Sequence, residues 1–292
     1  MPLVRFLASL AAILLTACSV GKMTADVPVV PTATIDRRQT TDDGRPTSAA
    51  LASSVVRRPS SVVEYDGIWR EIAPGLEVRG VSAKVGAREE LLLMVRVDPA
   101  QQPIRLKYDA AAPKTVREWF ETTAVVVVIN AGYFLEDRRT AALLVVDGVT
   151  HGRTYKGFGG MFALRGAEPS LWWLRREAYA GDESITQAVQ SVPMLVDGVE
   201  VVPGIPENGE RNRRSFVALD ERGRVLLGVS QTAAWTLTDL ATYLASEPEL
   251  EVRAALTLDG GASSGLWVRG ALDGMLTNSL EAVPSVIVVG TP

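Results

Sequence analysis

The stretch that decides the fold is Leu258-Asp259-Gly260-Gly261-Ala262-Ser263-Ser264-Gly265. An alternating run, 254–258, precedes it and a short apolar run, 266–268, follows it, so we expect a strand to end at the Asp259 carboxylate. The two glycines allow a sharp turn and a close approach of backbone N–H groups to a ligand. Such N–H groups can bind an anion. These features suit a phosphate or sugar site at a strand end. Taken alone, the stretch favours a hairpin turned by Asp-Gly, and the rest of the chain favours the site.

Polar residues also lie at the ends of other apolar runs of the chain. Residues 124–129 form a continuous run that is rich in β-branched side chains, typical of a central strand buried on both faces, and Asn130 ends it. Further along, Gln190 and Ser191 precede a proline, and Arg214 opens another apolar run. Polar groups at strand ends are how a sheet builds a binding site along one edge. We therefore expect these side chains to gather near Asp259.

The remaining pattern indicates an α+β fold, a single domain with a mixed β-sheet and two or three helices. Helical spacing of apolar residues predicts helices over 114–122 and 236–246, and a partly helical segment over 178–188. Strands are expected on both sides of a Pro-Gly turn in 69–80, and at 91–98, 104–108, 143–146, 171–174, 213–220, 224–230, 253–258 and 283–289. The folded domain is predicted to span 62–292.

The pattern of the first residues indicates an export signal. Arg5 precedes a short apolar run, 6–15, which is too short to span a bilayer. The run ends in Leu15-Thr16-Ala17-Cys18, which resembles a bacterial lipobox. This predicts a lipoprotein signal peptide over 1–17, cleaved before Cys18, whose thiol is then lipidated. The alternative is a plain secretory signal with an incidental cysteine.

Residues 18–61 are predicted to be a flexible tether. They are poor in aromatic residues and rich in Thr, Pro, Ala, Ser and Arg, so they cannot bury enough apolar surface to offset the entropy of ordering. A lipid on Cys18 would attach the protein to a membrane. Because Ser19, and not an aspartate, follows that cysteine, we expect a lipid-anchored protein of the cell envelope, on the periplasmic face of the outer membrane.

Composition narrows the chemistry. The 292 residues carry a formal net charge of −4, so no basic excess points to nucleic acid. One Cys and one His exclude zinc sites of the Cys/His kind, and any Ser–His–Asp triad must use His151. We predict no cofactor, although Mg²⁺ or Ca²⁺ held by Asp259 and Asp137 stays an alternative.

Four motifs in order resemble the phosphodiester glycosidase family, which includes N-acetylglucosamine-1-phosphodiester α-N-acetylglucosaminidases. The motifs are Ile129-Asn130-Ala131-Gly132-Tyr133-Phe134, Gln190-Ser191-Val192-Pro193-Met194-Leu195-Val196-Asp197-Gly198, Arg214-Ser215, and Leu258-Asp259-Gly260-Gly261-Ala262-Ser263-Ser264. The resemblance runs from about Trp69 to the C-terminus. It implies cleavage of a sugar-1-phosphodiester at the anomeric C–O bond, and bacterial members are often associated with exopolysaccharide metabolism.

The resemblance implies the following catalytic roles. We expect Asp259 to act as nucleophile or base near the anomeric carbon, and Arg214 to bind the phosphate through its planar guanidinium. Asn130 and Gln190 are expected to hold sugar hydroxyls. A second carboxylate could come from Glu136 or Asp137, although their charged run is also typical of a solvated loop. His151 could face the site or lie in a solvated loop.

Further residues are expected to bind substrate. Ser263 and the Gly260-Gly261 backbone would complete an anion pocket, and Ser191 lies next to Gln190 in its motif. Tyr133, Trp235 or Trp267 could stack on a sugar face.

Two functions of different class follow from these residues. The first is an exported, lipid-anchored glycosidase that hydrolyses a GlcNAc-1-phosphate type of phosphodiester in envelope or extracellular glycans. The second is a non-catalytic envelope lipoprotein that binds a glycan or a partner protein on the same fold. A chain that retains Asp259, Asn130 and Arg214 favours the enzyme, because a binding protein could lose them.

Overall fold

A computed structural model describes residues 65–269 and 277–290 of the chain. All of them belong to one compact unit, Ser61–Pro292. The predicted signal peptide (1–17), the tether (18–61) and the lipidation site Cys18 lie outside the described residues. No described helix is long and apolar enough to cross a membrane.

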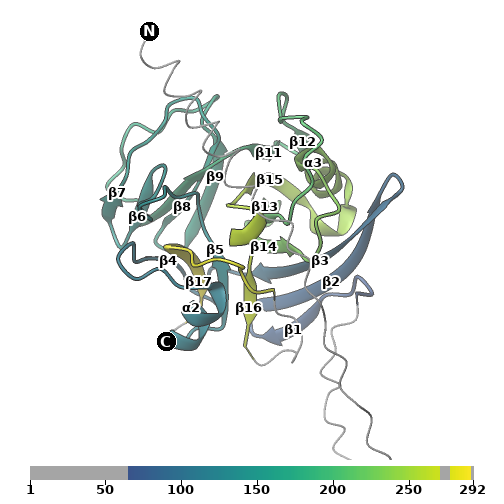
Figure 1. Ribbon diagram of the computed structural model, residues 1–292, viewed down its shortest axis with the longest axis horizontal. Helices are drawn as coiled ribbons and strands as arrows, with labels where there is room; N and C mark the ends of the chain where they lie inside the picture. The colour runs from purple at the N-terminus through teal and green to yellow at the C-terminus, as the bar shows by residue number, and fades with distance from the viewer. Residues whose placement is uncertain (1–64, 270–276, 291–292) are drawn as a thin grey trace, which may run out of the picture. The chain divides into compact units, whose positions relative to one another are not determined.

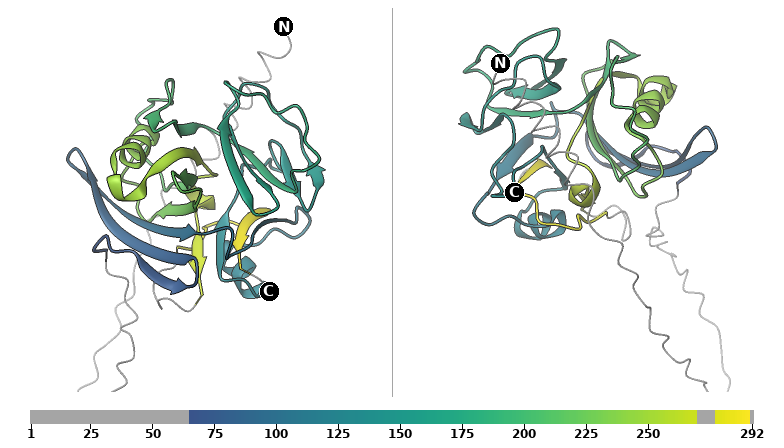
Figure 2. Two further views of the ribbon diagram at one scale, coloured as in Figure 1. Left: turned by 180° about the vertical axis from the view of Figure 1, so that it is seen from behind. Right: turned by 45° about the horizontal axis from the view of Figure 1, so that its top comes forward.

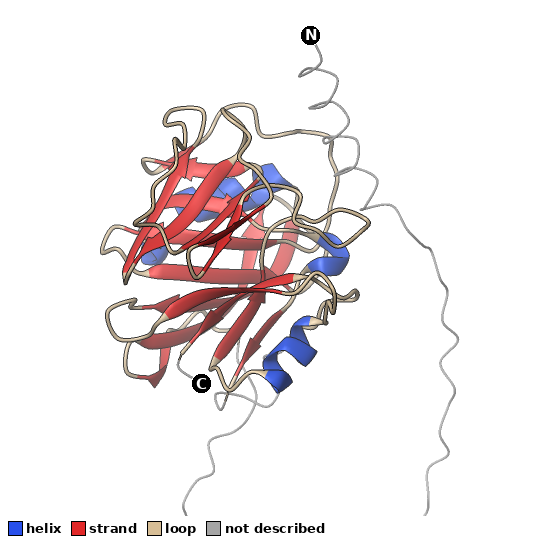
Figure 3. Ribbon diagram, turned by 90° about the vertical axis from the view of Figure 1, so that its left-hand side faces the viewer, coloured by secondary structure: helices blue, strands red, loops and turns tan. Residues whose placement is uncertain are grey.

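The described strands form three sheets, and these dominate the fold (Figures 1 and 3). The eight-stranded sheet has the order β1 (Arg70–Ala73), β2 (Leu76–Val85), β3 (Arg88–Val97), β14 (Val225–Ser230), β13 (Ser215–Asp220), β15 (Val252–Thr257), β11 (Met194–Asp197), β12 (Glu200–Val201). The five-stranded sheet has the order β7 (Val149–His151), β6 (Leu144–Val146), β10 (Gln187–Ser191), β8 (Gly160–Arg165), β9 (Glu168–Trp173). The four-stranded sheet has the order β16 (Leu266–Val268), β5 (Val127–Asn130), β17 (Ser285–Val289), β4 (Ile104–Tyr108).

The centre of the eight-stranded sheet is buried on both faces. Every residue of β13 and β14 is buried, which fits their apolar sequences. The two strands pair so that Phe216 lies opposite Gly228. A Cβ at Gly228 would lie only 2.1 Å from the Phe216 ring, so glycine is required there for the aromatic ring to pack. β15 lies beside β13 and carries the chain toward Asp259.

Two α-helices were correctly predicted, and each begins with a capping box. Helix α2 (Val116–Thr122) starts at Thr115, whose hydroxyl accepts from the Glu118 N–H. Helix α3 (Leu237–Ser246) starts at Thr236 in the same way and packs on the large sheet over β11 and β15 (Figure 2). The two short 3₁₀ segments are η1 (Pro248–Leu250) and η2 (Gly261–Ser263).

The prediction of a partly helical segment over 178–188 is wrong. These residues form a loop in which Asp182 accepts from the Ser184 N–H at 2.9 Å, and then enter β10 at Gln187. Local hydrogen bonding of this kind by Asp competes with a helix. The Gln190-Ser191 pair, which precedes a proline in the sequence, is the end of β10.

The α+β class is confirmed, with a correction to the sheets. Among the described residues every strand pairing is antiparallel, whereas a mixed sheet was expected. The hairpin alternative for Asp259-Gly260 is wrong as well. β15 and β16 belong to different sheets, and η2 connects them. The strand-end interpretation of Asp259 therefore holds.

Candidate active site

The candidate site lies where the chain leaves β15 and β5. The Asp259 N–H donates to the Ala131 carbonyl at 3.0 Å, so the loop after β15 lies against the loop after β5. The Gly261 N–H donates to the Arg213 carbonyl at 2.8 Å, which brings the residues before β13 to the same place. Three of the four motifs singled out in the sequence thus meet along one edge, from two different sheets.

Asn130 holds this junction together. Its side chain is fully buried, and its amide donates to the Asp259 carbonyl at 2.7 Å. Its carbonyl oxygen accepts from the Ser215 hydroxyl at 2.7 Å and from the Gly265 N–H at 3.1 Å. This burial leaves no exposed amide for a sugar hydroxyl, so we assign Asn130 to fixing the Asp259 loop, in place of the substrate contact expected from the sequence.

Asp259 is electrostatically unusual. Burial raises the pKa of its carboxyl from 3.8 to about 7, and the negative charge of Glu281 adds to this rise. Contacts with the Ser263 hydroxyl and the Gly260 N–H oppose it. A carboxyl with a pKa near neutrality can exchange a proton at working pH, and such groups concentrate in active sites.

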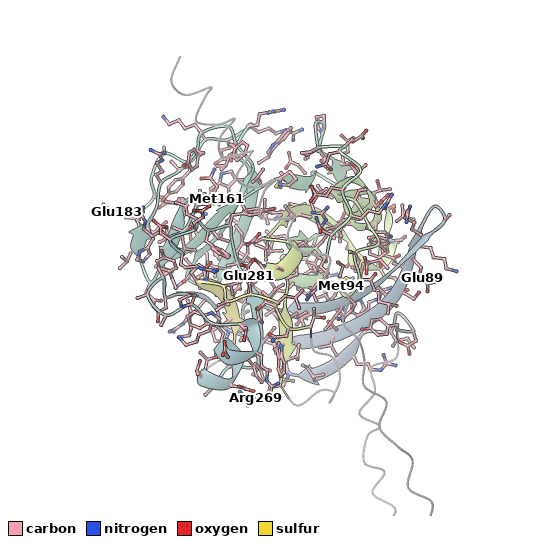
Figure 4. All side chains as sticks on the ribbon, in the orientation of Figure 1. Glu89, Met94, Met161, Glu183, Arg269 and Glu281 are labelled. Atoms are coloured by element: carbon pink, nitrogen blue, oxygen red, sulfur yellow. The ribbon has the colours of Figure 1, made fainter. Side chains whose placement is uncertain are left out.

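Glu281 is a site residue that the sequence analysis missed. The Ser263 hydroxyl donates to its Oε1 at 2.9 Å, and Arg138 lies 3.5 Å from its Oε2. Figure 4 shows Glu281 near the middle of the view. Its only sequence signal is an isolated acidic residue shortly before the last strand, which is far from any of the four motifs.

Glu136 and Asp137, the expected second carboxylates, are exposed. Asp137 pairs with Arg139 at 2.7 Å, and its hydrogen bonds with Arg139 lower the pKa of this carboxyl. They belong to the solvated loop that was the alternative interpretation, and Glu281 takes the place beside Asp259.

Arg214 lies beside the Asp259 loop and is 8% exposed. Its backbone N–H donates to the Ser230 hydroxyl at 2.7 Å, and its Nη2 donates to the Glu210 carbonyl at 2.8 Å. A Cβ placed on Gly260 would lie 3.8 Å from its Nη1, so the guanidinium reaches the residue that follows Asp259. The expected neighbourhood of Arg214 and Asp259 is present in the structure.

The neighbouring Arg213 has a different task. Its guanidinium donates to the Ser264 carbonyl and, at 2.9 Å, to the Asn278 carbonyl. Burial lowers its pKa. These bonds connect the segment after η2 to the segment before β17. Arg213 therefore stabilises the loop that follows Asp259.

The anion pocket of backbone N–H groups is largely closed. Gly261 has the positive φ (62°) that favours glycine, as the sequence suggested. Its N–H, however, is bonded to the Arg213 carbonyl, and the N–H groups of Ser263 and Ser264 donate to the carbonyls of Gly260 and Gly261. These three groups therefore build the turn and are not available to an anion.

Gln190 and Ser191 lie at the end of β10 and are both buried. The Gln190 amide accepts from the Tyr155 N–H at 2.9 Å and donates to the carbonyls of Tyr155 and Phe158, each at 2.8 Å. Gln190 thus positions the 155–158 loop. The Ser191 hydroxyl is buried and has no hydrogen-bond partner among the described residues. Tyr133 follows β5, and its carbonyl accepts from Ala141.

A small pocket of about 140 Å³ lies at the start of β11, lined there by Val192, Pro193 and Met194. The Thr257 N–H donates to the Pro193 carbonyl at 3.2 Å, so the pocket wall is one strand away from the end of β15. Aromatic and apolar side chains dominate the lining, with one arginine: Phe158, Trp173, Arg175, Val192, Pro193, Met194, Val202, Pro203, Ile205 and Pro206, together with three glycines.

Two of the three expected stacking residues are unsuitable. Trp235 is 1% exposed and packs on Tyr243, with ring centroids 5.2 Å apart. Trp267 packs on Phe120, with ring centroids 5.6 Å apart, in the apolar cluster formed by helix α2 and the four-stranded sheet. His151 packs on Tyr108 with ring centroids 4.7 Å apart, in β7.

Within the described ranges, 65–269 and 277–290, no three His, Cys, Asp or Glu side chains gather in a way that could hold a metal ion.

A sequence model of the phosphodiester glycosidase family matches residues 123–290, more than half of the chain. The chain therefore belongs to the phosphodiester glycosidase family. The match spans all four motifs as well as Glu281. No curated protein sequence matches the chain significantly.

Solved structures share the fold at low sequence identity. The catalytic domain of zebrafish N-acetylglucosamine-1-phosphodiester α-N-acetylglucosaminidase, solved in a form auto-inhibited by its pro-peptide, superposes with a TM-score of 0.60 and 17% identity, over 76% of this chain and 86% of that one. A hypothetical protein from Synechocystis gives 0.55 and 15%, over 74% and 62%. A putative exported protein from Burkholderia pseudomallei gives 0.53 and 12%, over 72% and 76%.

Proposed function

We propose that this protein hydrolyses a sugar-1-phosphodiester of the N-acetylglucosamine-1-phosphate type. The observation that carries the proposal is the position of Arg214 beside the loop of Asp259, whose carboxyl has a pKa of about 7. A phosphate-binding cation next to a group that can donate a proton is what cleavage of a glycosyl phosphate requires. Membership of the family supports this class of reaction.

The site has two flanks around Asp259, and we assign one substrate part to each. The phosphate binds on the Arg214 side, because a guanidinium fork matches two phosphate oxygens. The sugar lies toward the pocket lined by Phe158 and Trp173, because aromatic faces stack on the apolar faces of sugar rings. The anomeric C–O bond then lies over Asp259.

In the proposed step, protonated Asp259 is the general acid. The bond between the anomeric carbon and the phosphate oxygen breaks, and its electron pair stays on that oxygen. The oxygen takes the proton of Asp259, while water adds to the anomeric carbon and releases a proton to solvent. The products are a free sugar and a phosphomonoester. Arg214 stabilises the charge that develops on the leaving phosphate.

This role differs from the nucleophile or base expected from the sequence, and pH separates the two. A nucleophile or base must be ionised, so kcat would rise as pH increases through about 7. A general acid must be protonated, so kcat falls over the same range. A falling limb is the outcome that we expect.

We also propose that the protein works in the cell envelope, attached by lipid on Cys18 at the periplasmic face of the outer membrane. The lipobox-like sequence before Cys18 supports this location. Its substrates would then be envelope glycans or exopolysaccharides carrying a phosphodiester at the anomeric position.

The test is hydrolysis of N-acetylglucosamine 1-(methyl phosphate) by the full chain in water enriched in ¹⁸O. We expect the label in the released sugar, since the C–O bond breaks. Label in the phosphate instead would identify a phosphodiesterase. Asp259→Asn should lower kcat about 10³-fold, because general acid catalysis contributes roughly 10²–10⁴-fold.

The matched control is Asp137→Asn, which removes an exposed carboxylate and should leave kcat unchanged. Full activity of Asp259→Asn would remove this residue from the chemistry. Absence of turnover with a panel of sugar phosphodiesters, accompanied by tight binding of one of them, would favour the non-catalytic glycan-binding lipoprotein.

A further inference from the structure

Asp259 and Glu281 are joined by a single hydroxyl group. The Ser263 Oγ donates to Glu281 Oε1 at 2.9 Å and also contacts the Asp259 carboxyl. A serine hydroxyl has only one proton to donate. While that proton is directed to Glu281, the Ser263 oxygen can only accept from Asp259, and Asp259 can donate only when it is protonated.

We propose that Glu281 is a positioning residue that acts through Ser263 to keep the proton on Asp259. The chain of donors runs in one direction, from the Asp259 carboxyl to the Ser263 oxygen and from the Ser263 hydroxyl to the ionised Glu281. A Ser263 proton donated to Asp259 would favour its ionised form, but the bond to Glu281 takes up that proton, so an ionised Asp259 would face a second carboxylate with only the Gly260 N–H left to donate to it. This inference rests on the proposed function, because the protonated form is the one that acts as general acid.

Other charges around the pair fit this polarity. Arg138, from the loop after β5, lies 3.5 Å from Glu281 Oε2 and compensates the charge of that carboxylate. Its Nη1 also donates to the Ala282 carbonyl at 2.8 Å, which holds it in place. Arg214 approaches the Asp259 loop from the β13 side, and Arg213 bonds the loop carbonyls from behind.

The two carboxyl groups therefore have separate tasks. The Glu281 side chain is 36% exposed, and its Oε2 lies 3.5 Å from its cationic partner Arg138. Burial raises the pKa of Asp259, and the charge of Glu281 acts in the same direction. A negative charge near a buried carboxyl favours the protonated form of that carboxyl.

The experiment is a ¹³C NMR titration of the carboxyl groups in the full chain, comparing the wild type with Glu281→Gln. Removing the charge of Glu281 should lower the midpoint of Asp259 by about one pH unit. Glu281→Asp, which keeps the charge, should stay close to the wild type. Asp137→Asn, the matched control, removes an exposed carboxylate that pairs with Arg139 and should not move the midpoint.

Activity provides the second measurement. The alkaline limb of the kcat profile should move to lower pH in Glu281→Gln by the same amount as the Asp259 midpoint, with kcat near the wild-type value at pH 5. An Asp259 midpoint that is the same in Glu281→Gln and the wild type would overturn the inference. So would a pH-independent loss of kcat in this variant, which would make Glu281 a direct participant.

The NMR measurement needs no substrate, so it separates this inference from the proposed function. A shifted midpoint in a protein that cleaves no sugar phosphodiester would support the Asp259–Ser263–Glu281 chain and reject the substrate class. An unshifted midpoint in an active enzyme would reject the chain and leave the glycosidase in place.

Discussion

Two aspartates at opposite ends of the neighbouring strands β13 and β15 differ in what surrounds them. Asp220 is the last residue of β13 and is fully buried. Its carboxylate accepts from the backbone N–H groups of Arg222 and Arg224 at 3.0 and 2.8 Å. The Arg224 Nε adds a third bond at 2.6 Å. Asp259 follows the C-terminal end of β15, beside the start of β13. There the Ser263 hydroxyl lies between its carboxyl and the carboxylate of Glu281.

The contrast separates a carboxylate that stabilises the fold from one that is suited to chemistry. Donors and a cation around Asp220 compensate its desolvation, as a buried charge requires. Asp259 is held by protein that favours its neutral form, which is a cost to stability if it ionises. Structures accept such a cost at active sites, where stability and activity oppose each other.

The largest effect that tests this contrast is the pH dependence of stability. The pKa of Asp259 is raised from 3.8 to about 7, so between these values the folded state holds a proton that the unfolded state releases. Stability therefore falls as pH rises from about 4 to about 7, by up to roughly 4 kcal/mol at about 1.4 kcal/mol per unit. Asp259→Asn should abolish this loss and be more stable than the wild type at pH 8. Urea denaturation at pH 5 and pH 8 measures both.

Equal pH dependence of the wild type and Asp259→Asn would show that this carboxyl is not strained by its surroundings. Asp137→Asn is the control for the general effect of removing a charge, because Asp137 is exposed.

A smaller effect of the opposite kind is expected at Asp220. Asp220→Asn keeps the shape of the side chain and removes the charge that faces Arg224, so a partly buried cation loses its main partner. We expect a loss of about 2 kcal/mol, below the full cost of breaking a buried pair because Glu251 stays within 3.4 Å of Arg224. The urea midpoint should fall, while kcat/KM per folded molecule stays unchanged. If Asp220→Asn were fully stable but had a much lower kcat/KM, Asp220 would belong to the active site and would not be a stabilising residue.

The same contrast explains what could be predicted from the sequence. The Asp259 stretch and the Asn130 stretch were identified because each combines a polar residue with glycine at the end of an apolar run. Both helices were identified from the spacing of their apolar residues. These signals are local, and local chemistry determines strand ends, turns and caps.

The residues that were missed or placed in another role depend on distant contacts. Glu281 meets Ser263 across 18 positions of the chain, and nothing in its own neighbourhood marks it. Gln190 looked suited to a sugar hydroxyl, but its amide is fully engaged by the backbone of residues 35 and 32 positions away. Antiparallel pairing of distant strands was likewise not visible, since strand patterns alone do not fix partners.

Two arginines extend the comparison to the smallest effect. Arg224 donates to the carboxylate of Asp220, whereas Arg214 donates to the carbonyl of Glu210 and reaches toward Gly260. If Arg214 binds phosphate through two parallel bonds, Arg214→Lys keeps the charge and loses the fork, because an ammonium group is a point donor. We expect kcat/KM to fall about tenfold, which is about 1.4 kcal/mol and within the range of one charge-assisted hydrogen bond. Arg224→Lys is the matched control and should lower the urea midpoint without changing kcat/KM. If instead Arg214→Lys were as active as the wild type and Arg224→Lys were not, the phosphate would bind at the C-terminal end of β13, beside Asp220 and Arg224.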